Sequence, residues 1–138
     1  MAYFLVKSEA DVWSWDQQAA KGAKGEPWTG VRNFQARNYL KAMKKGDKCF
    51  FYHSGDDKEV VGIAEVIKEA YPDATAKEGD WICVDIKADK PLKTPVKLSA
   101  IKAEKKLADM VLVKNSRLSV QPVTAEQWAA VCKMGGVK

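Results

Sequence analysis

The chain has 138 residues, of which 46% are hydrophobic and 30% are charged, and its formal net charge is +5. This size and balance predict a single globular domain with its own apolar core, and they exclude a disordered chain. The longest apolar run, residues 1–6, is too short for a signal peptide or a membrane span, so neither secretion nor membrane insertion is expected.

Short apolar and β-branched runs predict strands at residues 3–6, 48–54, 60–67 and 81–87, with shorter candidates at 111–113 and 118–120. Helices are predicted to begin after Ser14, Asn33 and Thr124 and to extend to about residues 21, 45 and 134. Ser14 and Thr124 each stand three residues before a glutamine, which is the spacing of a capping box. Pro91 and Pro95 predict a turn, and residues 99–109 predict another short helix. This order of elements predicts an α+β fold, with short helices flanking a small, bent, mixed β-barrel.

The residues that usually bind metals are scarce. The three cysteines are widely separated, without a CxxC pair, and His53 is the only histidine. Such a set predicts neither disulfides nor a zinc site, so we expect a reduced, cytoplasmic protein without a metal or organic cofactor. On a strand, His53 and Ser54 would point to opposite faces, so they cannot act together as base and nucleophile.

Lysine and arginine are distributed differently along the chain. Seven lysines fall within residues 87–106, where they form either a patch for a polyanion or an ordinary solvated surface. All three arginines and all three asparagines fall within residues 31–38 and 115–117. Because these side chains offer fixed, planar sets of hydrogen-bonding groups, this clustering indicates a recognition site. Chance and helix capping are the alternative explanation.

Five stretches, in order along nearly the whole chain, resemble the EVE domain, a member of the PUA-like superfamily related to YTH domains. They are residues 3–9 (YFLVKSE), 28–38 (WTGVRNFQARN), 51–54 (FYHS), 62–66 (GIAEV) and 116–122 (SRLSVQP). The family usually has a proline after the Lys-Ser-Glu of the first stretch, whereas this chain has Ala10. This difference should loosen the turn that follows the first strand.

The resemblance implies a PUA-like barrel with an aromatic pocket for one modified nucleobase, either flipped out of a duplex or unpaired. Trp28, and with it Trp15, would stack on the base, while Ser8, Asn33 and Ser119 would read its edge. Arg32, Arg117 and nearby lysines would hold the nucleic-acid backbone. The full set of expected ligand-binding residues is Lys7, Ser8, Trp15, Trp28, Val31, Arg32, Asn33, Tyr52, Ser54, Ser116, Arg117, Leu118 and Ser119.

Several of these residues have a second, purely structural interpretation. Asn33 can cap a helix, and Arg32 and Arg37 can form salt bridges. Trp13 and Trp15 are each either a pocket wall or a core residue, whereas the positions of Trp81 and Trp128 predict core packing. On the predicted strand 48–54, Tyr52 and Ser54 share one face, and His53 is expected to be structural.

The first interpretation is therefore a non-enzymatic module that binds a modified base in DNA or RNA and does not associate with membranes. One alternative is an enzyme that acts on a modified base or nucleotide, although the sequence contains no GxSxG, P-loop, GxGxxG or HExxH motif. Another is a sensor of a small, nucleoside-like molecule. The oligomeric state cannot be predicted from these patterns.

Overall fold

The strand predicted at residues 48–54 forms as β3 (Lys48–Ser54), and its alternating side chains divide the core in two. In the computed structural model, which describes residues 1–115 and 117–137, Cys49 and Phe51 belong to one apolar cluster. Phe50 and Tyr52 belong to a second cluster on the opposite face of the sheet. The period-two pattern of this strand thus predicts its two faces correctly.

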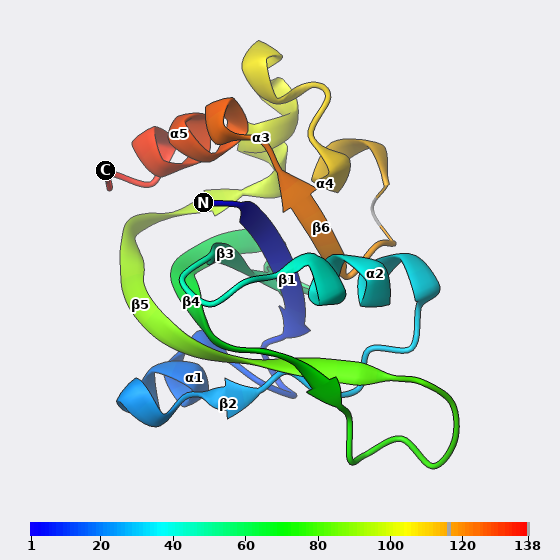
Figure 1. The fold of residues 1–138 in the computed structure, drawn as a ribbon. Helices are drawn as coiled ribbons and strands as arrows, with labels where there is room; N and C mark the ends of the chain where they lie inside the picture. Colours follow the sequence, from blue (N-terminus) through cyan, green and yellow to red (C-terminus); the bar gives the residue numbers. More distant parts are fainter. Residues whose placement is uncertain (116, 138) are drawn as a thin grey trace.

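One sheet of six strands carries the fold, in the order β2 (Glu26–Pro27), β5 (Ile82–Lys97), β4 (Glu59–Pro72), β3, β1 (Tyr3–Glu9) and β6 (Val120–Val123). β1 runs parallel to β3, and the other neighbours are antiparallel. The sheet curls strongly (Figure 1), but among the described residues its edge strands β2 and β6 do not pair with each other. The α+β class is therefore confirmed, while the predicted barrel remains open.

The helices cover the two faces of the sheet unequally (Figure 1). α1 (Trp15–Ala20) and α2 (Phe34–Ala42) contribute buried side chains to the first cluster, and the one-turn η1 (Gly22–Lys24) follows α1. The second cluster is covered by α3 (Leu98–Ala103), η2 (Lys105–Leu107), α4 (Val111–Lys114) and α5 (Ala125–Met134). Both predicted capping boxes form, at Ser14 and at Thr124.

Several predicted elements differ from the structure. The strand expected at residues 118–120 forms as β6, from Val120 to Val123. β5 extends to Lys97 through Pro91 and Pro95, where a turn was expected. Proline is tolerated there because β2 pairs with β5 only at Asp85 and Ile86, so β5 has no second partner strand beyond that point. Residues 111–113 form α4 instead of a strand, because tertiary packing of the buried Leu112 outweighs their β propensity. α2 ends at Ala42, three residues earlier than predicted.

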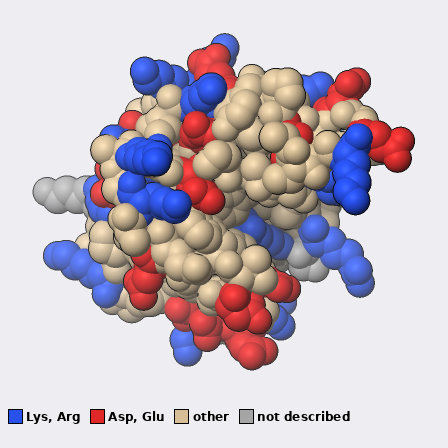
Figure 2. All heavy atoms as spheres, turned by 90° about the horizontal axis from the view of Figure 1, so that it is seen from below, with Lys and Arg blue, Asp and Glu red and all other residues tan. Residues whose placement is uncertain are grey.

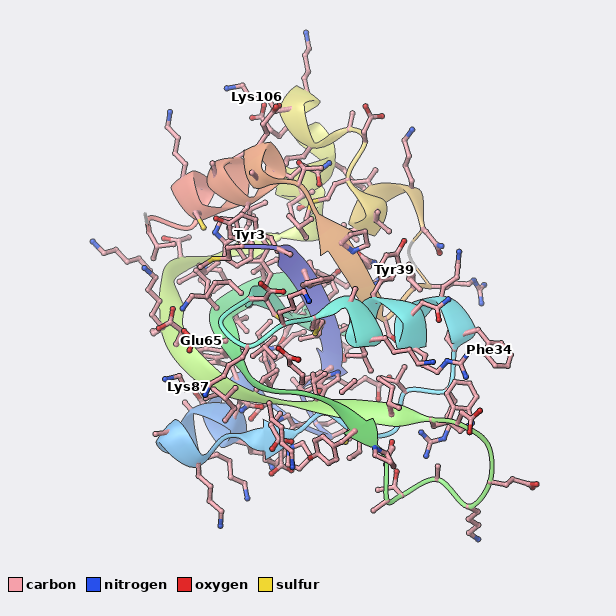
Figure 3. All side chains as sticks on the ribbon, in the orientation of Figure 1. Tyr3, Phe34, Tyr39, Glu65, Lys87 and Lys106 are labelled. Carbon is pink, nitrogen blue, oxygen red and sulfur yellow. The ribbon has the colours of Figure 1, made fainter. Side chains whose placement is uncertain are left out.

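The lysines of residues 87–106 do not form one patch. They lie on β5, α3 and η2, and Figure 3 shows Lys87 and Lys106 at well-separated places on the molecule. An extended strand advances about 3.3 Å per residue, so ten residues of β5 spread charge over roughly 30 Å. Within the described ranges, no helix is both long and apolar enough to cross a membrane.

Candidate functional site

A cavity of about 430 Å³ lies beside the carboxyl end of β1. Its other walls are the turn that follows β1, the segment from β2 to residue 32, and Ser119 just before β6. The lining residues are Lys7, Ser8, Glu9, Val12, Trp13, Glu26, Pro27, Trp28, Thr29, Gly30, Val31, Arg32 and Ser119. Figure 2, which views the molecule from below, shows a hollow right of the centre with basic atoms in its depth.

Backbone and hydroxyl hydrogen bonds fix the β1 side of the cavity. The Lys7 N–H donates to the Ser119 carbonyl at 3.0 Å, which joins β1 to the segment before β6. The Ser8 hydroxyl donates to the Trp13 carbonyl at 2.6 Å and so closes the turn that follows the strand. Because its single proton is used in this bond, the Ser8 oxygen can offer a ligand only acceptor lone pairs.

Two tryptophans of different burial supply aromatic surface to the cavity. Trp28 is buried, and its backbone N–H donates to the Val84 carbonyl at 2.7 Å. Its ring meets that of Phe51 edge to face, with centroids 5.5 Å apart. Trp13 is half-buried, and its indole N–H donates to the Gln18 side chain at 2.9 Å. Both rings are therefore held in place before any ligand arrives, which limits the entropic cost of stacking on them.

The wall formed by residues 28–32 is held by a buried carboxylate more than forty positions away. Oδ2 of Asp73 accepts from the Gly30 N–H at 2.9 Å and from Arg32 Nη1 at 3.1 Å. Gly30 has φ +85°, a conformation that other residues rarely adopt. Burial opposes ionisation of Asp73, but hydrogen bonds from Thr75, Gly30 and Arg32 outweigh it and lower its pKa to about 2. Asp73 thus remains charged at neutral pH and fixes both the wall and the Arg32 guanidinium.

Charges of both signs face the cavity. Burial lowers the pKa of the Lys7 ammonium, which lies 5.7 Å from the centre of the Tyr52 ring. Glu9 and Glu26 also line the cavity, and Glu26 pairs with Lys21 at 3.5 Å. Among the described residues, no three histidine, cysteine or acidic side chains are grouped so that they could hold a metal ion. The site can therefore offer a planar ligand stacking surfaces, cations, and carboxylate and hydroxyl acceptors.

The structure brings six of the thirteen predicted site residues together around the cavity: Lys7, Ser8, Trp28, Val31, Arg32 and Ser119. Six others do not line it, namely Trp15, Asn33, Tyr52, Ser54, Arg117 and Leu118. Trp15 and Leu118 are buried in the first core cluster, and Tyr52 in the second. Ser54 borders a separate acidic hollow, and the Arg117 side chain is exposed. Ser116 lies outside the described residues.

The capping interpretation of Asn33 is confirmed. Its side-chain oxygen accepts from the Ala36 N–H at 2.9 Å, so this oxygen is occupied by the helix. His53 is also structural, since its Nε2 accepts from the Trp15 N–H at 3.0 Å. Trp128 stacks on Tyr3 and Phe50, as expected of a core residue. Trp81 is not a core residue: it is half-exposed and stacks on the exposed ring of Phe34.

Trp13, not Trp15, lines the cavity, and a local signal distinguishes the two. Ser14 is the N-cap of α1, so Trp15 is its first helical residue whereas Trp13 lies outside the helix. Trp15 packs against Phe51 and directly over Gly62, where an added Cβ would lie 2.5 Å from the indole. β4 shifts its register between Val60 and Gly62 against both of its neighbours, β3 and β5. Sequence reasoning missed the other lining residues, namely Glu9, Val12, Glu26, Pro27, Thr29 and Gly30.

The fold and the cavity define a small α+β protein with a tryptophan-lined pocket beside an open, curved sheet. The sequence model of the EVE domain matches residues 2–134, and the chain belongs to this family. Thymocyte nuclear protein 1 of Gallus gallus is 38% identical over 130 residues, covering 78% of this chain and 54% of that protein. The chain thus spans about half the length of the curated relatives it matches.

Solved structures agree with this assignment. A protein of Rhodopseudomonas palustris solved by NMR is 68% identical, with a TM-score of 0.94 over 99% of this chain and 94% of that one. Human THYN1, solved in complex with DNA containing 5-methylcytosine, is 31% identical, with a TM-score of 0.91 over 100% of this chain and 99% of that one. The YTH domain of Zygosaccharomyces rouxii MRB1 is 16% identical, with a TM-score of 0.61 over 99% of this chain and 85% of that one. At that identity the likeness shows a shared fold alone.

Proposed function

We propose that this protein binds nucleic acid and receives a single modified base, flipped out or unpaired, in the cavity beside β1. The observation that carries the proposal is the placement of Trp13 and Trp28 around a 430 Å³ cavity with a polar, partly basic lining. That volume falls in the usual range for small-ligand sites. The complex of human THYN1 with DNA containing 5-methylcytosine supports the same conclusion.

Each wall has a role in this proposal. A base stacked on an aromatic ring gains about 1–3 kcal/mol, and Trp13 and Trp28 supply that surface. The Ser8 oxygen, which already donates its proton to the Trp13 carbonyl, would accept from an exocyclic amino group of the base. Lys7 and Arg32 would bind the phosphates beside the captured base, because both cations line the cavity.

Methyl discrimination would come from the apolar part of the lining. Val12, Pro27 and Val31 supply aliphatic surface to the lining. Burying one methyl group against such surface contributes about 1 kcal/mol, roughly a fivefold preference over the unmodified base. Modest selectivity combined with salt-sensitive binding to the backbone is the expected signature.

The test is a titration of the protein with short oligonucleotides that contain one cytosine, 5-methylcytosine, adenine or N6-methyladenine, at two salt concentrations. We expect one modified oligonucleotide to quench tryptophan fluorescence selectively, and Trp13→Ala and Trp28→Ala to remove that response. Trp128→Phe is the matched control, because Trp128 stacks between Tyr3 and Phe50 on the opposite face of the sheet. Equal, weak binding of all oligonucleotides would contradict the proposal. Tight, salt-independent binding of a free nucleoside would instead favour a small-molecule sensor, and release of an altered base would favour an enzyme.

A further inference from the structure

A second aromatic surface lies outside the cavity, at the N-terminal end of α2. Phe34 is the first residue of this helix and is 65% exposed, although it is a large apolar side chain. Its ring stacks on Trp81 with centroids 5.2 Å apart and planes 24° apart. Figure 3 shows Phe34 at the end of α2 that lies above the loop joining β4 to β5.

Arg37 completes this surface, which we call the aromatic platform (Phe34, Trp81 and Arg37). Its guanidinium lies 4.9 Å from the centre of the Phe34 ring and 5.4 Å from that of Trp81. Within residues 1–115 and 117–137, no carboxylate forms a salt bridge with Arg37, and its buried Nε has no hydrogen-bond partner. Among the described residues, its guanidinium makes one hydrogen bond, a marginal contact of 3.5 Å from Nη1 to the Asp80 carbonyl. The platform therefore holds a positive charge that no acidic group of the described protein neutralises.

The platform is continuous with the cavity. Arg32 lines the cavity, and its guanidinium also lies 5.8 Å from the centre of the Trp81 ring. Phe34 stands only three positions after Val31 of the cavity wall, a distance of about 10 Å at most along the chain. A nucleic-acid strand rises about 3.4 Å per nucleotide, so the next few nucleotides after a captured base can reach the platform.

We infer that the aromatic platform is a second nucleic-acid contact, on which an unpaired base flanking the captured one stacks while Arg37 binds its phosphate. The inference rests on the proposed function in one respect, namely that the cavity holds a modified base next to the base that stacks on the platform. An exposed ring beside an unneutralised arginine is the combination that single strands require, because every base has a π-face and every nucleotide a phosphate. Local packing alone accounts poorly for Phe34, since a polar residue would serve the first position of a helix at lower solvation cost.

The test compares the affinities of Phe34→Ala and Arg37→Gln with that of the wild type for three ligands. These are a single-stranded oligonucleotide with one central 5-methylcytosine, the same strand with cytosine, and the 5-methylcytosine mononucleotide. We expect each variant to bind both strands about tenfold more weakly while binding the mononucleotide as the wild type does. Phe34→Trp should restore strand binding, and Gln35→Ala, at the exposed neighbouring position, should leave it unchanged.

The outcomes separate this inference from the proposed function. Unchanged strand binding by both variants would overturn the platform even if the cavity prefers the methylated strand. Equal weakening for strands and mononucleotide would also overturn it, because it would indicate a distorted cavity. If the cavity shows no preference for the modified base but Phe34→Ala still weakens both strands, the platform stands and the proposed function fails. If the protein alone binds no oligonucleotide, and strands bind only after a protein partner is added, both proposals are overturned.

Discussion

Helices cover the two faces of the curved sheet to different extents. The face that carries Leu5 and Phe50 is covered by four helical segments, and both of these side chains are fully buried. The opposite face, which carries Val6 and Phe51, is covered by two short helices and a loop. That covering layer supplies Trp15 and Trp28, and this side borders the cavity. On this less covered side, the rings of Phe51, Trp15 and Trp28 pack against one another and support the cavity wall, while the cavity itself stays open.

The largest effect should come from the neighbouring residues Phe50 and Phe51, which point to opposite faces. Each substitution to alanine should lower the free energy of unfolding by about 3–5 kcal/mol, because each removes a fully buried ring. Urea denaturation measures this loss. Only Phe51→Ala should also weaken oligonucleotide binding in the folded fraction, since Phe51 contacts both Trp15 and Trp28. Similar binding defects in both variants would contradict the prediction that only the face with Phe51 supports binding.

Gly62→Ala should destabilise the open face by about 1–3 kcal/mol, through overpacking. The new Cβ would lie 2.5 Å from the Trp15 ring, which cannot move without displacing Phe51. Trp15→Phe in the same chain should recover part of the loss by making room. A double-mutant cycle based on thermal unfolding measures this coupling, and strictly additive losses would contradict the contact.

Asp73→Asn should cost about 1–2 kcal/mol, because hydrogen bonds from Gly30, Arg32 and Thr75 would lose their charged acceptor. The folded pKa of Asp73 lies below its usual value of 3.8, so ionised Asp73 stabilises the fold above that value. This contribution is lost as the pH falls from about 4 towards 2. Thermal unfolding across that range should show the difference between wild type and Asp73→Asn shrinking as the pH falls. A constant difference would mean that the charge of Asp73 is not the cause.

The smallest effects concern lysines. Lys7→Gln, at the cavity, should reduce the slope of log affinity against log salt by about 1, as the loss of one phosphate contact predicts. Lys106→Gln should leave both affinity and slope unchanged, because Lys106 lies on η2, over the opposite face. Because burial lowers the pKa of Lys7, its contribution should also disappear earlier in an alkaline titration than that of an exposed lysine. Equal changes in slope for both variants would indicate a diffuse basic surface.

Features that depend on neighbours in the chain could be predicted from the amino-acid order. The capping boxes at Ser14 and Thr124 and the two faces of residues 48–54 follow from local hydrogen bonding and from the period of a strand. The motifs at residues 28–38 and 116–122 determined the family. These two motifs also contain Trp28, Val31, Arg32 and Ser119, which line the cavity.

Tertiary structure alone decided the rest, because the deciding contacts join residues far apart in the chain. Gly30 and Arg32 find Asp73 more than forty positions away, and Arg37 finds Trp81 at a similar distance. Likewise Gly62 determines where Trp15 packs, which leaves Trp13 to face the cavity. Local periodicity reports which face of an element is apolar, but it does not report which distant element will cover that face.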